Sequence, residues 1–329
     1  MNVLTKTIQG QTIHYTRLGL GLAALGRPGY MNLGHAEDLP AERTQEAMLL
    51  HAMGVLDAAW AAGVRYYDVA RSYGAGELFL NTWLRIRNIA PDQVTVGSKW
   101  GYTYTAQWKV QAEQHEVKDH SLAALRRQIG ESSTLLGERL KLYQIHSATL
   151  ESGVLEKSDV LDELARLRDG GLIIGLSVSG VQQATVIEKA LTLVRGGSPI
   201  FGSVQTTWNL LERSAGPMLA EAHRAGWLVI IKEGLANGRL TSRGLPAASP
   251  LRQLGDRNQR PVDSLALAAI LAQPWADVVL SGAATKEQLL SNMKSTEDLW
   301  GETENELTSK MMLQSAEEYW RQRSTLTWN

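Results

Sequence analysis

Helix-like and strand-like patterns alternate along the chain from about Thr44 to Leu280, and this alternation constrains the fold more than any other feature. Each strand-like pattern is a short, continuous apolar run, which is typical of parallel strands buried on both faces. The predicted strands cover residues 64–67, 94–98, 142–145, 172–176, 201–204, 227–231 and 278–280, and the predicted helices cover residues 44–62, 77–87, 117–136, 160–168, 181–194, 216–225 and 261–271. A further strand around Leu20 brings the number to eight. We therefore predict an α/β fold, a closed (β/α)8 TIM barrel, with an open parallel sheet as the alternative.

The segments outside the alternation predict additions to this barrel. Residues 7–17 favour an N-terminal hairpin with its turn at Gln9–Gln11. Extra C-terminal helices are expected over residues 281–296 and near residues 304–321. Residues 241–260 read as the one long polar loop, and no linker rich in Pro or Ser divides the chain. We expect a single domain over residues 1–329.

Composition excludes several classes of protein. The chain has 33 basic and 34 acidic residues, so neither nucleic acid nor a membrane surface is an expected partner. Cysteine is absent, which excludes disulfides, thiolate nucleophiles and Cys-ligated metal clusters. No segment resembles a signal peptide or a membrane span, so we expect a cytoplasmic protein. Whether it is a monomer or a homo-oligomer stays open.

Two motif-like patterns are set aside. Gly19 to Ala24 reads Gly-x-Gly-x-x-Ala with Asp38 downstream, but a dinucleotide fingerprint needs a helix that begins at the glycines. Here the chain continues as a loop to about Thr44, so we do not expect a Rossmann fold. His115 and His120 resemble a helical zinc motif stretched by one residue, which would turn their rings about 140° apart on a helix. No metal site is expected.

Four polar residues fall at the ends of consecutive predicted strands. Asp68 and Tyr73 follow the strand that ends at Tyr67, in a Gly-rich loop. Lys99 and His146 directly follow the next two strands. Alone, each has an ordinary explanation as a cap, a solvated cation or a core histidine. A barrel would bring all four to one mouth, and we predict the catalytic centre there.

The chemistry that these four residues support is carbonyl reduction. A phenol has a pKa of about 10, and a nearby ammonium would lower it. Tyr73 is therefore the expected general acid, Lys99 its tuning cation and Asp68 the anchor of Lys99. His146 would donate a hydrogen bond that orients the carbonyl. Because no side chain donates hydride, a nicotinamide cofactor is implied.

With these residues in place, the chain resembles an aldo-keto reductase from Leu18 to about Asn292. The matching motifs are Asp68–Gly74, Gly97–Trp100, Leu142–His146, Ile174–Ser177, Gln205–Asn209, Leu235–Leu240 and Ser281–Ala283. The resemblance implies an eight-stranded barrel with bound NADP(H) and the four catalytic roles given above. It also implies cofactor contacts at Gly21, Ser177, Gln205, Trp208, Lys232, Glu233, Gly234, Leu235, Gly238, Gly282, Ala283, Gln288 and Asn292.

The chain departs from this family at three places. Lys232 stands where the family usually stacks an aromatic ring on the nicotinamide, so Lys232 is expected to contact phosphate or ribose instead. Gly282 and Gln288 stand where many members hold the 2′-phosphate with Lys and Arg, with Lys286 the basic residue nearby. NADP(H) stays the expected cofactor, and NAD(H) is the alternative. The residue that follows Ser177 in the family's Ser-Asn pair is Val178.

An aromatic wall is predicted for the substrate pocket. Trp100, Tyr102, Tyr104 and Trp108 follow Lys99, and Trp208 would lie opposite. Such a wall suits an aromatic aldehyde or the flat face of a sugar, and simple loop packing is the alternative explanation.

Three functions follow from these observations. The first is an NADP(H)-dependent reductase of a small aldehyde or ketone, and the second is an NAD-dependent aldose dehydrogenase that uses the same site. The third is a regulatory subunit that senses bound nucleotide, although a sensor does not need an acid and its tuning cation.

Overall fold

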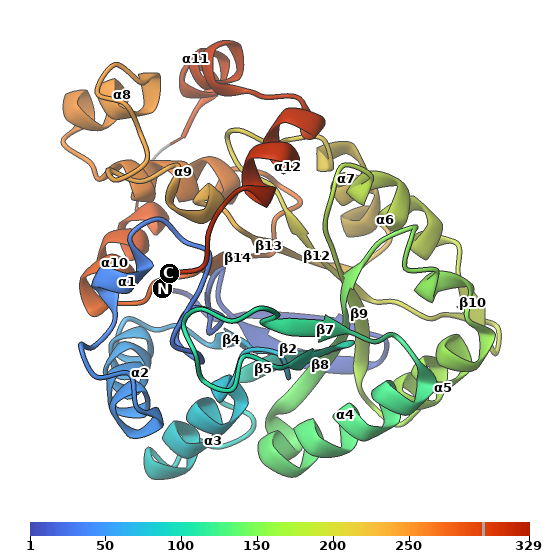
Figure 1. The fold of residues 1–329 in the computed structure, drawn as a ribbon. Helices are drawn as coiled ribbons and strands as arrows, with labels where there is room; N and C mark the ends of the chain where they lie inside the picture. Colours follow the sequence, from blue (N-terminus) through green and yellow to red (C-terminus); the bar gives the residue numbers. More distant parts are fainter. Residues whose placement is uncertain (298–299) are drawn as a thin grey trace.

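The computed structural model describes residues 1–297 and 300–329, and its centre is a closed barrel of eight parallel strands (Figure 1). The barrel strands are β3 (Leu18–Gly21), β4 (Tyr66–Asp68), β5 (Thr95–Trp100), β8 (Leu140–Ala148), β9 (Ile173–Val178), β12 (Ser203–Thr207), β13 (Leu228–Lys232) and β14 (Val278–Ser281). They are hydrogen-bonded in chain order, and β14 pairs with β3 to close the sheet. The predicted TIM barrel is therefore confirmed, and the open sheet is excluded.

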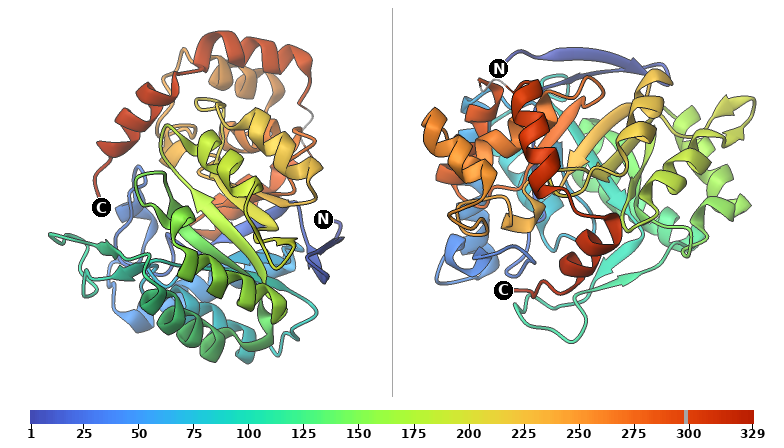
Figure 2. Two further views of the ribbon diagram at one scale, coloured as in Figure 1. Left: turned by 90° about the vertical axis from the view of Figure 1, so that its right-hand side faces the viewer. Right: turned by 90° about the horizontal axis from the view of Figure 1, so that it is seen from above.

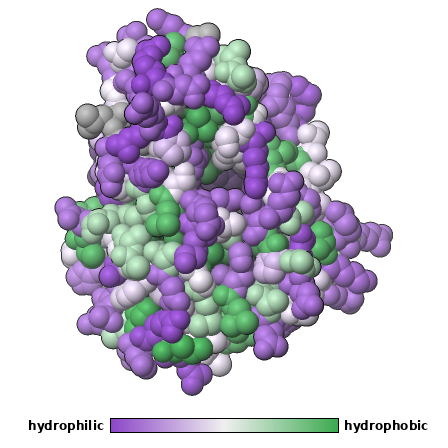
Figure 3. Space-filling model, turned by 90° about the vertical axis from the view of Figure 1, so that its left-hand side faces the viewer, coloured by the Kyte–Doolittle hydropathy of each residue, from purple (hydrophilic) through white to green (hydrophobic). Residues whose placement is uncertain are grey.

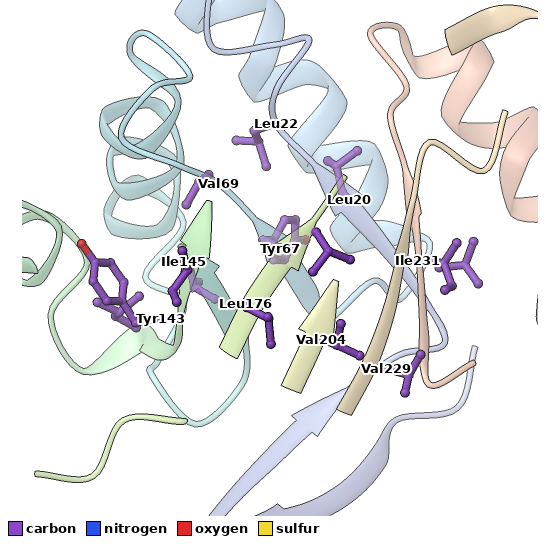
Figure 4. Packing of buried hydrophobic residues seen from close by; sticks show 14 of the residues in the cluster. Leu20, Leu22, Tyr67, Val69, Tyr143, Ile145, Leu176, Val204, Val229 and Ile231 are labelled. Atoms are coloured by element: carbon purple, nitrogen blue, oxygen red, sulfur yellow. The ribbon is translucent and has the colours of Figure 1, made fainter. Parts of the chain in front are cut away.

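Helices surround the barrel and bury the outer face of its strands (Figure 1). They are α2 (Gln45–Ala61), α3 (Gly76–Ile86), α4 (Leu122–Leu136), α5 (Ser158–Asp169), α6 (Gln183–Leu191), α7 (Gly216–Arg224), α9 (Val262–Leu271) and α10 (Lys286–Met293). Residues such as Leu20, Tyr67, Leu176 and Val204 belong to the apolar layer between strands and helices (Figure 4). Alternate residues point into the barrel instead, which explains why the strands are apolar without alternation.

The predicted N-terminal hairpin is present and closes one end of the barrel. It consists of β1 (Leu4–Ile8) and β2 (Gln11–Tyr15). Both turn residues, Gln9 and Gly10, have positive φ values of 49° and 78°, as a two-residue hairpin turn requires. Apolar side chains of the hairpin pack on inward-facing residues at the N-terminal ends of the strands. The C-terminus and the strands β6 (Tyr102–Tyr104) and β7 (Glu116–Lys118) lie at the opposite end of the barrel (Figure 2).

The segment after β5 differs from the prediction of a helix over residues 117–136. Its beginning forms the strand β7 (Glu116–Lys118), which pairs with β6 (Tyr102–Tyr104). The helix α4 begins only at Leu122, because the Ser121 hydroxyl accepts a hydrogen bond from the Ala124 N–H at 3.1 Å. A short pair of strands, β10 (Val194–Arg195) and β11 (Ser198–Pro199), likewise follows α6.

The C-terminal third also corrects three predictions. Ser281 ends β14 rather than beginning a helix, and α10 starts after the cap Thr285. The predicted polar loop contains α8 (Pro250–Asn258), capped by Ser249. The predicted last helix is two helices, α11 (Glu302–Met312) and α12 (Ala316–Ser324), because Leu313 is extended and Ser315 caps a new helix. These helices share a second apolar cluster with α9.

None of the helices in the described ranges is long and apolar enough to cross a membrane.

Candidate active site

A cavity of about 470 Å³ opens at the C-terminal ends of the barrel strands. Its lining comes from the strand ends, from the loops after β3, β13 and β14, and from the first turns of α10. The side of the molecule that carries α1 (His35–Asp38) and α10 is hollowed, with hydrophilic residues on much of the rim (Figure 3). This end of the strands is where barrel proteins of this type bind ligands.

Asp68, Tyr73 and Lys99 form a connected group at the cavity floor. The Lys99 ammonium is fully buried and donates hydrogen bonds to the Asp68 carboxylate, to the Val69 carbonyl at 3.0 Å and to the Tyr73 hydroxyl at 3.2 Å. The second oxygen of Asp68 accepts a hydrogen bond from the Gln205 amide at 2.8 Å. All three donors of the ammonium are thereby used.

The loop that carries Tyr73 is fixed by close backbone contacts. A Cβ at Gly26 would lie 2.3 Å from the Tyr73 carbonyl oxygen, so only glycine lets the loop after β3 approach this closely. The Ala75 N–H donates to the Gly26 carbonyl at 2.7 Å. Gly26, two residues after the Gly-x-Gly-x-x-Ala pattern, thus supports the loop that carries Tyr73. Because the strands close into a barrel, the expectation against a Rossmann fold is confirmed.

Arg71 holds the same loop from its outer side. Its guanidinium donates to the buried Glu77 at 2.6 Å and to Glu131 on α4 at 2.9 Å. Glu77 also accepts hydrogen bonds from Ser98 at 2.5 Å and from Ser132 at 2.7 Å. This buried carboxylate is well satisfied, and it connects the loop to α3, β5 and α4.

His146 is aimed at Tyr73 by an irregularity in β8. The register of β8 against β9 shifts between Ile145 and Ala148, and Ser147 has a positive φ of 51°. The Ser177 hydroxyl accepts a hydrogen bond from the Ser147 N–H at 2.8 Å and stabilises this bulge. The His146 ring then lies edge-on to the Tyr73 ring, with 5.6 Å between centroids, and its Nδ1 is 3.3 Å from the Ser72 hydroxyl.

The environment keeps both Tyr73 and His146 uncharged at neutral pH. Burial, assisted by Asp68, raises the pKa of Tyr73 well above its usual value. The pKa of Tyr73 is therefore raised rather than lowered as expected, because burial and the charge of Asp68 outweigh the lowering effect of Arg27. Burial also lowers the pKa of His146 well below its usual value, and the charges of Lys99, Lys232 and Arg27 add to this effect.

Lys232 and Glu233 end β13 beside this group. The Lys232 ammonium donates to the Thr207 hydroxyl at 3.2 Å, and burial lowers its pKa to about 8. Burial raises the pKa of Glu233, but Arg323 and Lys232 outweigh this and lower it to about 2. Glu233 has a positive φ of 53° and an ion pair of 2.6 Å with Arg323 of α12.

The α10 end of the cavity has room for part of a dinucleotide. A Cβ at Gly282 would meet nothing within 4 Å, so the backbone there borders open space. The Asn237 side-chain oxygen is buried without a hydrogen-bond partner among the described residues. The Gln288 side-chain oxygen accepts a hydrogen bond from the Ala284 N–H at 2.9 Å. The Asn292 side-chain amide forms hydrogen bonds with the Ser281 hydroxyl and the Asp263 carboxylate. The open backbone at Gly282 and the unpaired oxygen of Asn237 fit a nucleotide ligand.

Two loops that line the cavity are joined by an ion pair. Arg243 lies in the loop after β13, and Asp38 lies in the segment after β3. The two terminal nitrogens of Arg243 each donate a hydrogen bond of 2.7 Å to the Asp38 carboxylate. Bidentate pairs of this geometry fix both partners. The loops after β3 and β13 are therefore fastened together beside the cavity.

Most of the residues predicted from the sequence come together here. Those that line the cavity are Gly21, Asp68, Tyr73, His146, Gln205, Lys232, Glu233, Gly234, Leu235, Gly238, Gly282, Ala283, Gln288 and Asn292. Lys99 lies directly beneath them and contacts Tyr73. Ser177 acts through Ser147 rather than at the cavity surface.

The predicted aromatic wall is largely dispersed. Trp100 is fully buried, Trp208 packs on Trp275, and Trp108 packs on Phe79. The Tyr104 hydroxyl accepts the Trp108 N–H, so these two stabilise their own loop. Tyr102 alone of the five lies against the catalytic group, with its ring 5.0 Å from that of His146. Loop packing is the better description of the rest.

Several cavity residues were missed by the sequence analysis. Arg27, Tyr30 and Glu116 line the cavity close to Tyr73, and Arg323 reaches it from α12. An arginine between Gly26 and Pro28, in a loop that a barrel places at its mouth, was the one signal available for Arg27. Glu116 directly precedes the helix predicted over residues 117–136 and belongs to β7 instead, and Arg323 lies far from every motif.

Comparison with known proteins shows the family to which the chain is similar. A model of the Aldo/keto reductase family matches residues 17–307. A D-threo-aldose 1-dehydrogenase from a Pseudomonas species is 25% identical over 310 residues, which cover 88% of each chain. The Protein tas of Escherichia coli strain K12 is 23% identical over 90% of this chain and 95% of its own.

Among solved structures, the holo form of an aldo-keto reductase from Bacillus halodurans matches with a TM-score of 0.69 and 20% identity, over 94% of this chain and 96% of that chain. At this identity the match supports the fold only, whereas the family model spans most of the chain. The chain belongs to the aldo/keto reductase family and is an oxidoreductase.

Proposed function

We propose that the protein reduces an aldehyde or ketone to an alcohol, with Tyr73 as the general acid and NADP(H) as the cofactor expected from the sequence. The observation that carries this proposal is the contact of 3.2 Å between the Tyr73 hydroxyl and the Lys99 ammonium, which is itself ion-paired with Asp68. The chain acts as one domain over residues 1–329. A cytoplasmic location stays a prediction.

The roles of the four residues follow from their protonation. Tyr73 keeps its proton at neutral pH and gives it to the carbonyl oxygen, while Lys99 stabilises the phenolate that forms. With Nδ1 of His146 facing the Ser72 hydroxyl, its Nε2 is free to donate a hydrogen bond to the same oxygen and to orient it. Asp68 fixes Lys99. A bound nicotinamide would supply the hydride.

The cofactor would be held along the cavity from β12 to α10. Gln205, Lys232 and the Gly234–Gly238 segment would hold the nicotinamide half, and Gly282, Gln288 and Asn292 the adenosine half. Ser177 and Trp208 are not in contact with this cavity, so their predicted cofactor contacts would need a rearrangement.

Replacing Tyr73 with Phe tests the proposal. We expect turnover to fall by about 10²–10⁴-fold, because the variant has no proton to give. Binding of the nicotinamide cofactor, followed by quenching of tryptophan fluorescence, should persist. Tyr15→Phe is the matched control, since it removes a phenolic oxygen at the closed end of the barrel. Full turnover by the Tyr73 variant would exclude Tyr73 as the acid.

A second candidate, oxidation of an aldose with NAD, is favoured by one specific observation. Of the described cavity residues contributed by β14, α10 and the loop between them, Glu287 is acidic and none is basic. A 2′-phosphate placed there would have no basic residue of these elements in the cavity lining beside it, since Lys286 of α10 is exposed and does not line the cavity. The aldose dehydrogenase named above is a relative of matching length.

Titrating the protein with NADPH and NADH separates the two candidates. Tighter binding of NADPH would support the cofactor expected from the sequence, and tighter binding of NADH would support the second candidate. Gly282→Arg, which adds a cation where the backbone borders open space, should shift the preference towards NADPH in either case.

A further inference from the structure

The cavity wall beside Tyr73 is formed by an arginine and a glutamate that the proposed chemistry does not use. Arg27 lies in the loop after β3, and Glu116 lies on β7. The Arg27 guanidinium carbon is 5.3 Å from the centroid of the Tyr73 ring. Both residues line the cavity, so a substrate whose carbonyl meets Tyr73 extends past them.

Arg27 is a buried cation with unused hydrogen-bonding capacity. Its side chain is 3% exposed. One terminal nitrogen donates to the Ser72 carbonyl and to Glu116, each at 3.1 Å. Its Nε has no hydrogen-bond partner among the described residues. The guanidinium also packs on the ring of Trp328 at 4.6 Å. A buried donor without an acceptor is costly, so the guanidinium is incompletely satisfied by the described residues.

Glu116 supplies the complementary acceptor. Only one of its carboxylate oxygens binds Arg27, and its side chain is 24% exposed, so the other oxygen can face a ligand. Together the two side chains offer at least one donor and one acceptor while their charges cancel. The wall is therefore strongly polar without being strongly charged.

We infer that the Arg27–Glu116 pair selects a neutral, polyhydroxylated carbonyl compound by hydrogen-bonding its hydroxyl groups; this rests on the proposed function. A hydroxyl group can accept from the Arg27 guanidinium, which lines the cavity, and donate to Glu116 at the same time. A carboxylate in that place would meet the negative charge of Glu116. An alkyl chain would leave the Arg27 donor unpaired, and sites built for hydroxyl groups reject such analogues strongly.

Three four-carbon aldehydes test this inference. Erythrose carries hydroxyl groups, butanal carries none, and succinic semialdehyde carries a carboxylate. We expect kcat/KM for erythrose to exceed that for each of the others by at least about tenfold. Threitol, an unreactive polyol, should bind the protein with cofactor more tightly than 1,4-butanediol in isothermal titration calorimetry, which gives a readout that does not depend on turnover.

Glu116→Gln locates the selectivity. The change keeps the shape of the side chain but removes its charge at a partly exposed position, so the fold should persist. We expect the preference for erythrose over succinic semialdehyde to fall by about tenfold or more, because the carboxylate no longer meets Glu116 and Arg27 gains a free charge. Glu131→Gln is the matched control, since Glu131 also pairs with an arginine but lies outside the cavity; it should leave the preference unchanged.

Two results would overturn the inference while leaving the proposed function intact. One is turnover of butanal or succinic semialdehyde at least as efficient as that of erythrose. The other is an unchanged preference in the Glu116 variant. If instead none of the aldehydes is reduced with either nicotinamide cofactor, the proposed function itself fails.

Discussion

Two lysines at the mouth of the barrel have opposite surroundings: Lys99 is buried, and Lys232 is partly exposed to the cavity. Lys99 ends β5 and donates to a carboxylate, a carbonyl and a phenol, so each of its three donors has an acceptor. Lys232 ends β13, and its one hydrogen bond within the described part of the chain goes to the Thr207 hydroxyl. The same side chain is therefore fully engaged in one place and largely unengaged in the other.

We infer from this difference that Lys99 serves the internal network of the protein and that Lys232 can bind a ligand. A buried ammonium with all donors paired is held in one position, which suits a group that must stabilise a phenolate. A partly exposed ammonium with two free donors can bind a ligand, and the desolvation that lowers its pKa to about 8 makes its charge costly without a counter-charge. An anionic part of a cofactor would relieve that cost, as the sequence led us to expect for Lys232.

Replacing Lys99 should have the largest effect on stability and turnover. Lys99→Met leaves Asp68 buried without its ion pair, so the free energy of unfolding should fall by about 3–5 kcal/mol in urea denaturation. Turnover should be lost, because Tyr73 loses the cation that stabilises its phenolate. The double variant Asp68→Asn/Lys99→Met should recover much of the stability and none of the turnover. Wild-type stability in the single variant would contradict the description of Lys99.

Replacing Lys232 should change the free energy of unfolding less than replacing Lys99, and at neutral pH in the opposite direction. Between about pH 8 and pH 10.5 an unfolded chain keeps the Lys232 proton that the folded protein has lost. Stability should therefore rise with pH across this window in the wild type, by on the order of 1–3 kcal/mol, relative to Lys232→Met. Below pH 8 the charged form destabilises the wild type, so the variant should be the more stable protein there.

Urea denaturation at several pH values measures this difference, and comparison with the variant removes the contribution of the tyrosines that also titrate. Lys189→Met, which removes an exposed lysine paired with Glu156, is the control and should not change the pH dependence. A wild type that is the more stable of the two at pH 7 would show that Glu233 and Asp68 satisfy Lys232 after all.

The surroundings of Lys99 could be predicted from the sequence. Asp68, Lys99 and His146 directly follow apolar strand patterns, and a barrel brings such positions together. The strands were recognisable because both of their faces are buried, which leaves a continuous apolar run. The catalytic group thus follows from local patterns plus one topological rule.

The surroundings of Lys232 could not be predicted, because they depend on contacts between distant segments. Whether Lys232 has a carboxylate partner depends on Glu233, which turns to Arg323 about 90 residues later. Arg323 lies on a helix that the sequence merged with the preceding one, since the helical pattern continues across Leu313. Glu116 was likewise hidden in a short strand whose residues also fit a helix.

The smallest expected effect is on the pKa of His146, which the charges of both lysines lower. Burial is the main reason for its lowered pKa, followed by the charge of Lys99 and then that of Lys232. Lys232→Met should therefore raise the pKa of His146 without restoring the usual value, because burial and Lys99 remain. Titration of the imidazole C–H signals by NMR measures the change, and His146→Gln identifies the signal among those of the 7 histidines. In the wild type the acid side of the kcat/KM profile should show no step near pH 6.5, the usual histidine pKa, since His146 is neutral throughout that range. An unchanged His146 pKa in the variant would mean that the Lys232 charge does not reach the catalytic group, and the two lysines would then act independently.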